Sequence, residues 1–442
     1  MGKSTANKNL RNFFLYKVFY NARFYYPIFT ILFLDLGVTL EEFSLLNFVW
    51  AASIVLFEVP SGALADTIGR KPLIVSAVVL MCIEMVLLLS VPVGGGAWTF
   101  TILMINRVLS GLSEALGSGA DEALAYDSID ESEQEKVWPS VIKRTMQWQS
   151  LAFFFAMIFG AVIYDQNLMT PVFQWLSIEN ASSYIIRLPA LFTLLSGLFL
   201  LWVSLGFEEK KSEGFSPAKL IQCWGPIRQA MSRTWGSVCW VKKTPYVLGI
   251  IVWAVFFDHL ARQFLTLSSE YFRYLNLPEY MFGILGSCFA LIGFFTMPLA
   301  IRLYQKWTFK EMARNLSIFV FFTWLAIGFS ASLWVLGAVL LLSGVSKVFE
   351  YFVSNELNKE VSADQRATIL SIKGLSMNLG YGGIGILYSL FLYGTRLAGQ
   401  DFPQGEMAYT LPYFPAYFLL LFVCLFLFSR KKFFISQPKS SS

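Results

Sequence analysis

The sequence predicts an all-α integral membrane protein whose twelve transmembrane helices form two bundles of six. Three observations support this: an apolar composition, apolar stretches long enough to cross a bilayer, and positive charge concentrated in alternate connections. Hydrophobic residues make up 56% of the chain and charged residues 14%, with a mean hydropathy of +0.58. An ordinary soluble domain carries about a quarter charged residues. The net charge of +5 follows from the loop charges described below, so we expect no nucleic-acid partner.

Each apolar stretch is close to the ~20 residues that cross ~30 Å of hydrocarbon. Only helices satisfy their backbone hydrogen bonds in lipid over single spans of this length. In chain order, the expected spans are 13–35, 43–65, 72–92, 98–124, 140–164, 185–206, 245–270, 281–303, 313–330, 333–353, 367–393 and 410–429.

The cations between the spans predict the orientation of the chain, because cytoplasmic loops carry an excess of Lys and Arg. With twelve spans, one side holds Lys3, Lys8, Arg11, Arg70, Lys71, Lys143, Arg144, Lys210, Lys211, Lys242, Lys243, Arg302, Lys306, Lys310, Arg314, Arg430, Lys431 and Lys432. The opposite loops hold chiefly Arg273 and Arg396. We therefore expect a multi-pass protein of the cytoplasmic membrane with both termini in the cytoplasm.

A polar stretch divides the chain into an N-terminal bundle over 1–207, a linker over 208–244 and a C-terminal bundle over 245–442. Ser216-Pro217 is typical of a helix start. Apolar residues then recur at helical spacing, with an interruption near Gly225-Pro226: Leu220, Trp224, Ile227, Met231, Trp235 and Val238. With basic residues among them, this pattern predicts an amphipathic segment on the inner membrane surface that tethers the two halves.

The short connection between the second and third spans reads GALADTIGRK, and it contains Gly62, Asp66, Gly69, Arg70 and Lys71. It resembles the signature loop between helices 2 and 3 of major facilitator superfamily (MFS) transporters. One signature position differs, since Thr67 replaces the Arg that follows the Asp. The resemblance implies the MFS fold and a gating role for this loop.

Two further segments resemble the same superfamily. Arg107-Val-Leu-Ser110-Gly111 is similar to its R-x-x-Q-G element, and Arg366-Ala-Thr-Ile-Leu-Ser371 also recurs in it. The glycine-rich fifth-helix element of drug antiporters is missing from the segment 156–163, which weakens a prediction of drug efflux. The resemblance implies that Asp66 lies near the N-terminus of the eleventh span. It also implies that Arg70 pairs with an acid at the inner end of the fourth span, Asp127 first and Asp121 second.

Charged residues within spans are costly and are expected to face the bundle interior. In the fourth span, a 4-3-4-3 spacing places Arg107, Gly111, Glu114, Ser118 and Asp121 on one helical face. This stripe fits an aqueous path, and it also fits a set of interhelical salt bridges without a role in transport. Glu114 is our first candidate for a proton carrier, exchanging Arg107 for a proton during the cycle.

The seventh span concentrates three polar residues near its midpoint. Asp258 and Arg262 are one turn apart and could pair with each other. His259 is the only histidine. It could carry a proton, but a hydrogen-bonded packing role is the more common one for a lone histidine.

Further candidates for coupling or substrate binding are Glu58 in the second span and Lys347 and Glu350 in the tenth. Glu84 and Lys373 are additional charges in the third and eleventh spans. Lys17 and Arg23 lie in the inner half of the first span, where we expect their long side chains to reach the interface.

No enzyme motif, nucleotide-binding loop or cysteine pair with metal-ligand spacing is visible, so we expect no catalytic activity, cofactor or metal site. The five cysteines predict no disulfide framework. We therefore predict a monomeric secondary transporter of a small polar or charged solute, coupled to protons rather than sodium. Proton-coupled drug efflux, a non-transporting receptor or scaffold, and an intramembrane enzyme are the alternatives.

Overall fold

The computed structural model describes residues 3–209 and 223–429, and these residues form helices and connections without strands. They divide into two compact units, each described here by itself. Unit 1 comprises Met1–Ser232 and Asn276–Ala290, and unit 2 comprises Arg233–Leu275 and Leu291–Ser442. The predicted division at 207 and 244 stays a prediction. Its linker residues 210–222, with Ser216-Pro217, lie outside the described residues, as do residues 430–442.

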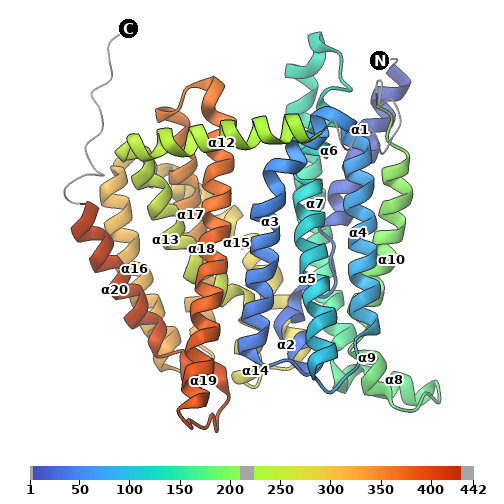
Figure 1. The fold of residues 1–442 in the computed structure, drawn as a ribbon. Coiled ribbons are helices and arrows are strands. Elements are labelled where there is room, and N and C mark those ends of the chain that lie inside the picture. The colour runs from blue at the N-terminus through green and yellow to red at the C-terminus, as the bar shows by residue number, and fades with distance from the viewer. Residues whose placement is uncertain (1–2, 210–222, 430–442) are drawn as a thin grey trace. The chain divides into compact units, whose positions relative to one another are not determined.

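The helices of unit 1 are α1 (Lys3–Tyr20), the short η1 (Tyr26–Ile28), α2 (Phe29–Asp35), α3 (Leu40–Ile68), α4 (Arg70–Ser90), α5 (Ala97–Gly117), α6 (Ala120–Tyr126), α7 (Glu131–Tyr164), α8 (Gln166–Trp175), α9 (Ala181–Ile185) and α10 (Leu188–Leu205). Two helices cross the border between the units, α12 (Trp224–Lys243) and α15 (Glu279–Lys306). The helices of unit 2 are α13 (Pro245–Thr266), α14 (Ser268–Tyr274), α16 (Phe309–Phe329), α17 (Val335–Glu360), α18 (Ala363–Leu397), α19 (Glu406–Thr410) and α20 (Tyr413–Ser429) (Figure 1).

Ten described helical segments are long and apolar enough to cross a membrane, and each coincides with a predicted span. The first predicted span is broken into α1, η1 and α2, and the fourth into α5 and α6. The break between α5 and α6 lies at Ser118–Gly119, where Gly119 has a φ of +72°. Glycine adopts this left-handed conformation without the penalty that a Cβ atom imposes. The fourth span was predicted as one continuous helix, and this detail is wrong.

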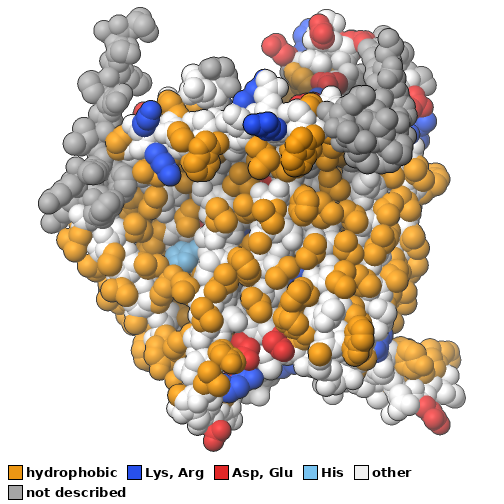
Figure 2. All heavy atoms as spheres, viewed as in Figure 1, with side chains coloured by type: hydrophobic (Ala, Val, Ile, Leu, Met, Phe, Trp, Pro, Cys, Tyr) orange, Lys and Arg blue, Asp and Glu red, His pale blue; other side chains and the backbone are white. Residues whose placement is uncertain are grey.

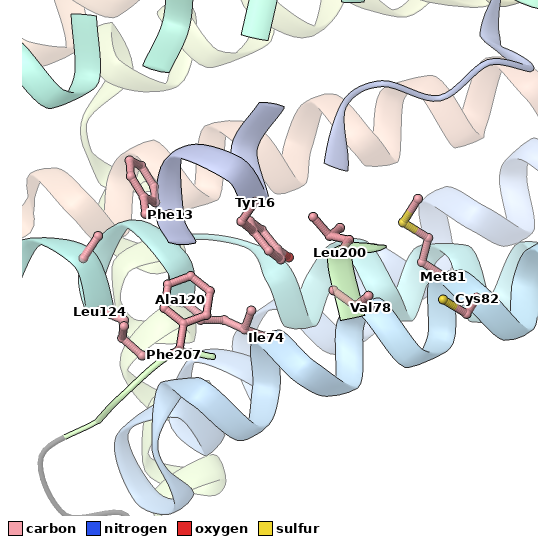
Figure 3. Close-up of a cluster of buried hydrophobic side chains, with 11 residues drawn as sticks. Phe13, Tyr16, Ile74, Val78, Met81, Cys82, Ala120, Leu124, Leu200 and Phe207 are labelled. Carbon is pink, nitrogen blue, oxygen red and sulfur yellow. The ribbon is translucent and has the colours of Figure 1, made fainter. Parts of the chain in front are cut away.

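The core of unit 1 joins residues that are far apart in the sequence. Its members come from α1, α4, α6, α10 and the segment that follows α10: Phe13, Tyr16, Ile74, Val78, Met81, Cys82, Ala120, Leu124, Ala125, Leu200 and Phe207 (Figure 3). This cluster holds α6 against α1 and α4, and so places the acids around α6 beside the cations of α1 and α4.

The first part of α15 packs closely on α7 within unit 1. A Cβ atom on Gly283 would lie 2.3 Å from the Met157 carbonyl oxygen, so only glycine permits this approach. The Ser287 hydroxyl donates to the Phe154 carbonyl over 3.1 Å. Small residues at such contacts are typical of helix packing in membranes.

Hydrophobic side chains cover much of the face shown in Figure 2. Phe294 and Phe295 of α15, for example, are 80% and 71% exposed. In water, this much exposed apolar surface would drive aggregation or association. On membrane-length helices it is the surface that faces lipid, so the chain is a multi-pass integral membrane protein.

Candidate functional site

The signature loop is the sharp turn that joins α3 to α4. α3 ends at Ile68, Gly69 has a φ of +94°, and α4 begins at Arg70. The Arg70 guanidinium forms an ion pair with Asp127, the first of the two predicted partners. Asp66 is exposed near the end of α3. Its predicted place beside the eleventh span stays a prediction, as does the gating role of the loop.

Glu209 completes this loop, and the sequence analysis missed it. One carboxylate oxygen accepts a hydrogen bond from the Arg70 backbone N–H over 2.8 Å, and the other accepts from the Lys71 N–H over 3.0 Å. An anion is favoured there because the first N–H groups of a helix lack partners within the helix. The φ of +94° at Gly69 favours glycine, because residues with a Cβ atom rarely adopt this conformation. Gly62 faces open space.

The carboxylate of Glu209 is held in place by its neighbour. The Asn9 amide of α1 donates to the Glu208 carbonyl over 2.7 Å and to the Ser128 hydroxyl over 2.8 Å. The Glu208 N–H donates back to Asn9 over 2.9 Å. The Lys8 ammonium also bonds the Glu208 side chain and lowers the pKa of that carboxyl. The end of α10 is therefore fixed to α1 and to the segment after α6.

A buried group of charges lies deeper in unit 1. Glu84 of α4 is fully buried, and its carboxylate lies 3.2 Å from Arg107 and 3.8 Å from Arg23. The Tyr25 hydroxyl donates to the Glu84 carboxylate, and the Asn106 amide donates to the Glu84 backbone carbonyl. Arg107 also lies over the ring of Phe29, at 5.3 Å. We call Arg23, Glu84 and Arg107 the buried triad.

The triad corrects one expectation. Arg23 is only 3% exposed, so it does not extend to the membrane interface. Lys17 pairs with the buried carboxylate of Asp121 over 2.9 Å and with Glu122 over 3.1 Å, and its reach to the interface stays a prediction. Helix α6 turns the Asp121 carboxylate towards α1, which is why this acid pairs with Lys17 and Arg70 pairs with Asp127 instead.

The predicted stripe on the fourth span is therefore divided among different partners. Arg107 belongs to the buried triad and Asp121 to Lys17. A Cβ atom on Gly111 would lie 2.6 Å from the Trp50 carbonyl oxygen, so this glycine permits close packing of α5 on α3. Glu114 is exposed, and its carboxylate accepts a hydrogen bond from the Tyr20 hydroxyl over 3.4 Å. Glu58 is half-buried on α3.

Unit 2 contains a cavity of about 480 Å³ between α13, α17 and α18. We call it the unit 2 pocket. Its lining residues are Ala254, Phe257, Asp258, Ala261, Arg262, Leu265, Thr266, Ser343, Ser346, Lys347, Phe349, Glu350, Val353, Lys373 and Met377. The volume lies within the ~300–1,000 Å³ range of small-molecule sites. The pocket thus combines apolar walls with five charged side chains.

Four of these five charges form two ion pairs. Asp258 lies 2.7 Å from Arg262, as their spacing predicted, and Lys347 lies 3.1 Å from Glu350. Arg262 also donates to the Asn378 side-chain oxygen over 2.9 Å and lies over the ring of Tyr381. The Lys373 ammonium has no carboxylate within ion-pairing distance in the part of the chain that the structure describes.

His259 lies outside the lining of this pocket. It is 6% exposed, its Nδ1 lies 3.0 Å from the Val255 carbonyl oxygen and its Nε2 lies 3.2 Å from the Tyr417 hydroxyl. This geometry fits the packing interpretation rather than a proton carrier. A role for His259 in coupling stays a prediction.

A family model described as Major Facilitator Superfamily matches residues 13–382. A search of curated protein sequences finds no match.

Solved structures share the fold. A nucleoside transporter, NupG, superposes with a TM-score of 0.66 at 11% identity, covering 97% of this chain and 99% of that one. A bacterial homologue of the human lysosomal transporter Spinster gives 0.68 at 15% identity, covering 100% of both chains. A D-xylose–proton symporter gives 0.59 at 13% identity, covering 95% and 96%. At these identities the likeness shows the fold alone.

Proposed function

Because the chain belongs to the Major Facilitator Superfamily of membrane transporters, we propose that it carries a small polar or charged solute across the cytoplasmic membrane by alternating access, driven by protons. The observation that carries this proposal is the unit 2 pocket. A charged side chain costs about 3 kcal/mol at the centre of a membrane-spanning helix on insertion scales. Five such residues around one cavity are expected if they bind a polar ligand and the water that accompanies it.

Proton coupling requires a carboxyl group that changes protonation as the cavity opens and closes. Glu114 is the first candidate because it is exposed rather than ion-paired within unit 1. Asp258 is the second, since it could exchange Arg262 for a proton, and Glu58 is the third. Among solved structures of this fold, one is named as a proton symporter of D-xylose and another as a nucleoside transporter. Both names are compatible with a polar solute, and neither identifies the solute of this chain.

We also propose that the protein acts as a monomer with both termini in the cytoplasm. The signature loop would close the inner gate through Asp66, Arg70, Lys71 and Asp127. Asp66→Asn would favour inward-facing states and slow turnover. Spin-label distances across the inner ends of the helices test this role, which fails if the populations are unchanged.

Uptake into proteoliposomes under an imposed pH gradient tests the function. A panel of polar and charged solutes is offered with the inside alkaline, with the inside acidic and without a gradient. The proposal expects accumulation of at least one solute that a protonophore abolishes. Accumulation of hydrophobic cations alone would favour drug efflux. A protein that binds solutes but moves none, with or without a gradient, would be a receptor or scaffold.

A further inference from the structure

The charges of the unit 2 pocket do not balance. Three cations, Arg262, Lys347 and Lys373, face two acids, Asp258 and Glu350. The two acids are taken by Arg262 and Lys347. One ammonium group, that of Lys373, is left over. Its residue is half-buried, and a partly desolvated charge without a partner is unfavourable.

We propose that the unit 2 pocket binds a small organic monocarboxylate, and that Lys373 is the residue that pairs with its carboxylate. This inference rests on the proposed transport function and names its substrate class. An anionic ligand supplies the charge that the pocket lacks. The ligand carboxylate and the Lys373 ammonium would then neutralise each other within the pocket. This pairing offsets most of the cost of desolvating either charge alone.

The pocket favours one negative charge over two. A phosphate monoester would bring a charge near −1.5 to −2 and would be best held by a free arginine, whose planar fork bonds two oxygens at once. The only arginine in the lining is occupied by Asp258, by Asn378 and by the ring of Tyr381. A lysine ammonium acts as a compact point charge, which suits a carboxylate.

The other lining residues of the pocket indicate the chemistry of the rest of the ligand. Phe257 and Phe349 stack with ring centroids 3.9 Å apart, and Val353 and Met377 add apolar surface. Ser343 and Ser346 supply hydroxyl groups on α17. The ligand class is therefore a carboxylate joined to an aromatic or branched apolar body, with room for a hydroxyl group.

Binding is measured on the full-length protein in lipid nanodiscs, without a gradient, by thermal shift and calorimetry. The probes are benzoate, phenylacetate and naphthoate, with their neutral amides, the matching amines, and phenyl phosphate as the dianion. We expect at least one acid to raise the apparent stability by mass action, while its amide and amine do not. If no acid binds, or if amide and acid bind equally, the proposal is overturned. Preferential binding of phenyl phosphate overturns the choice of a monocarboxylate.

Three variants test the role of Lys373. Lys373→Gln should weaken binding of the acid about tenfold or more, because a charge-assisted contact is lost. Lys373→Arg should retain most of the affinity. Lys373→Glu should abolish acid binding and permit binding of the amine, an inversion that general damage to the fold would not produce. The matched control is Lys306→Gln, an exposed lysine of α15 outside the pocket, which should bind as the wild type does. Unchanged acid affinity in Lys373→Gln overturns the assignment.

These results can be separated from failure of the proposed function. If acids bind through Lys373 but no gradient-driven uptake occurs, the proposal of proton-driven transport is rejected and the carboxylate site is retained. If the protein binds no acid but accumulates a neutral or cationic solute under a gradient, the transport proposal is retained and the carboxylate site is rejected.

Discussion

Units 1 and 2 both place charges in membrane-length helices, but they use them differently. In unit 1 the three members of the buried triad are at most 4% exposed. In unit 2 the side chains of Asp258 and Arg262 are 20% and 31% exposed, and those of Lys347 and Glu350 are 53% and 55% exposed. The first arrangement joins helices, whereas the second lines a cavity. A charge within a span therefore indicates function only when it remains accessible.

The largest effect is expected from Glu84→Gln, which leaves two buried arginines without their acid. Removing one partner of a buried ion pair typically costs about 3–5 kcal/mol. We expect much lower yield of folded protein and a large drop in unfolding temperature, measured in detergent by intrinsic fluorescence. Glu350→Gln in the unit 2 pocket is the matched control and should change stability little. Equal effects of the two substitutions would contradict the comparison.

A second substitution addresses the exposed acid of unit 1. Glu114→Gln should abolish gradient-driven accumulation while solute binding and passive exchange remain, because it removes a titratable group without breaking an ion pair within the unit. Asp258→Asn provides the parallel test in unit 2. Loss of binding with unaltered coupling per bound solute would place Glu114 in the substrate site. Transport that ignores both pH and membrane potential would remove protons from the mechanism.

A smaller effect is expected at the signature loop. Glu209→Gln keeps the shape of the side chain but weakens two hydrogen bonds to the first turn of α4. The loss of a charged helix cap costs about 1 kcal/mol. We expect a modest fall in unfolding temperature and faster hydrogen exchange at Arg70 and Lys71. Exchange rates that match those of the wild type would show that the carboxylate does not hold the loop.

The smallest effect is expected from the Lys347–Glu350 pair. Both side chains are more than half exposed and lie one turn apart on α17. Exposed pairs at this spacing contribute about 0.3–0.5 kcal/mol. A double-mutant cycle of Lys347→Ala and Glu350→Ala should give a coupling energy in this range. A coupling above about 2 kcal/mol would mean that this pair is as desolvated as a buried one.

The sequence predicted what depends on local pattern. Hydropathy located the spans, and the signature motif located the turn at Gly69 and the partner of Arg70. The Asp258–Arg262 pair was also predictable, because side chains four residues apart on a helix are neighbours on its surface.

Partners on different helices were not predictable in this way. Glu84 and Arg107 are 23 positions apart, and Glu209 is more than 130 positions from the turn that it caps. Their meeting depends on the rotation of each helix and on the breaks after Tyr20 and Gly117. One signal was available: Glu84 is the only acid within its span, so a buried cation had to lie nearby.

Two of the borders between the units fall within helices, one in α12 and one in α15. The first part of α15 completes unit 1 on α7 through Gly283, and its second part belongs to unit 2, where Gly293 lies beside Lys347. A chain cleaved between α10 and α12 would yield an N-terminal fragment that lacks Asn276–Ala290 and therefore does not hold the whole of unit 1. The fragment that begins with α12 would carry this missing piece of the packing surface of unit 1. Such fragments would remain associated after proteolysis and would separate only on denaturation.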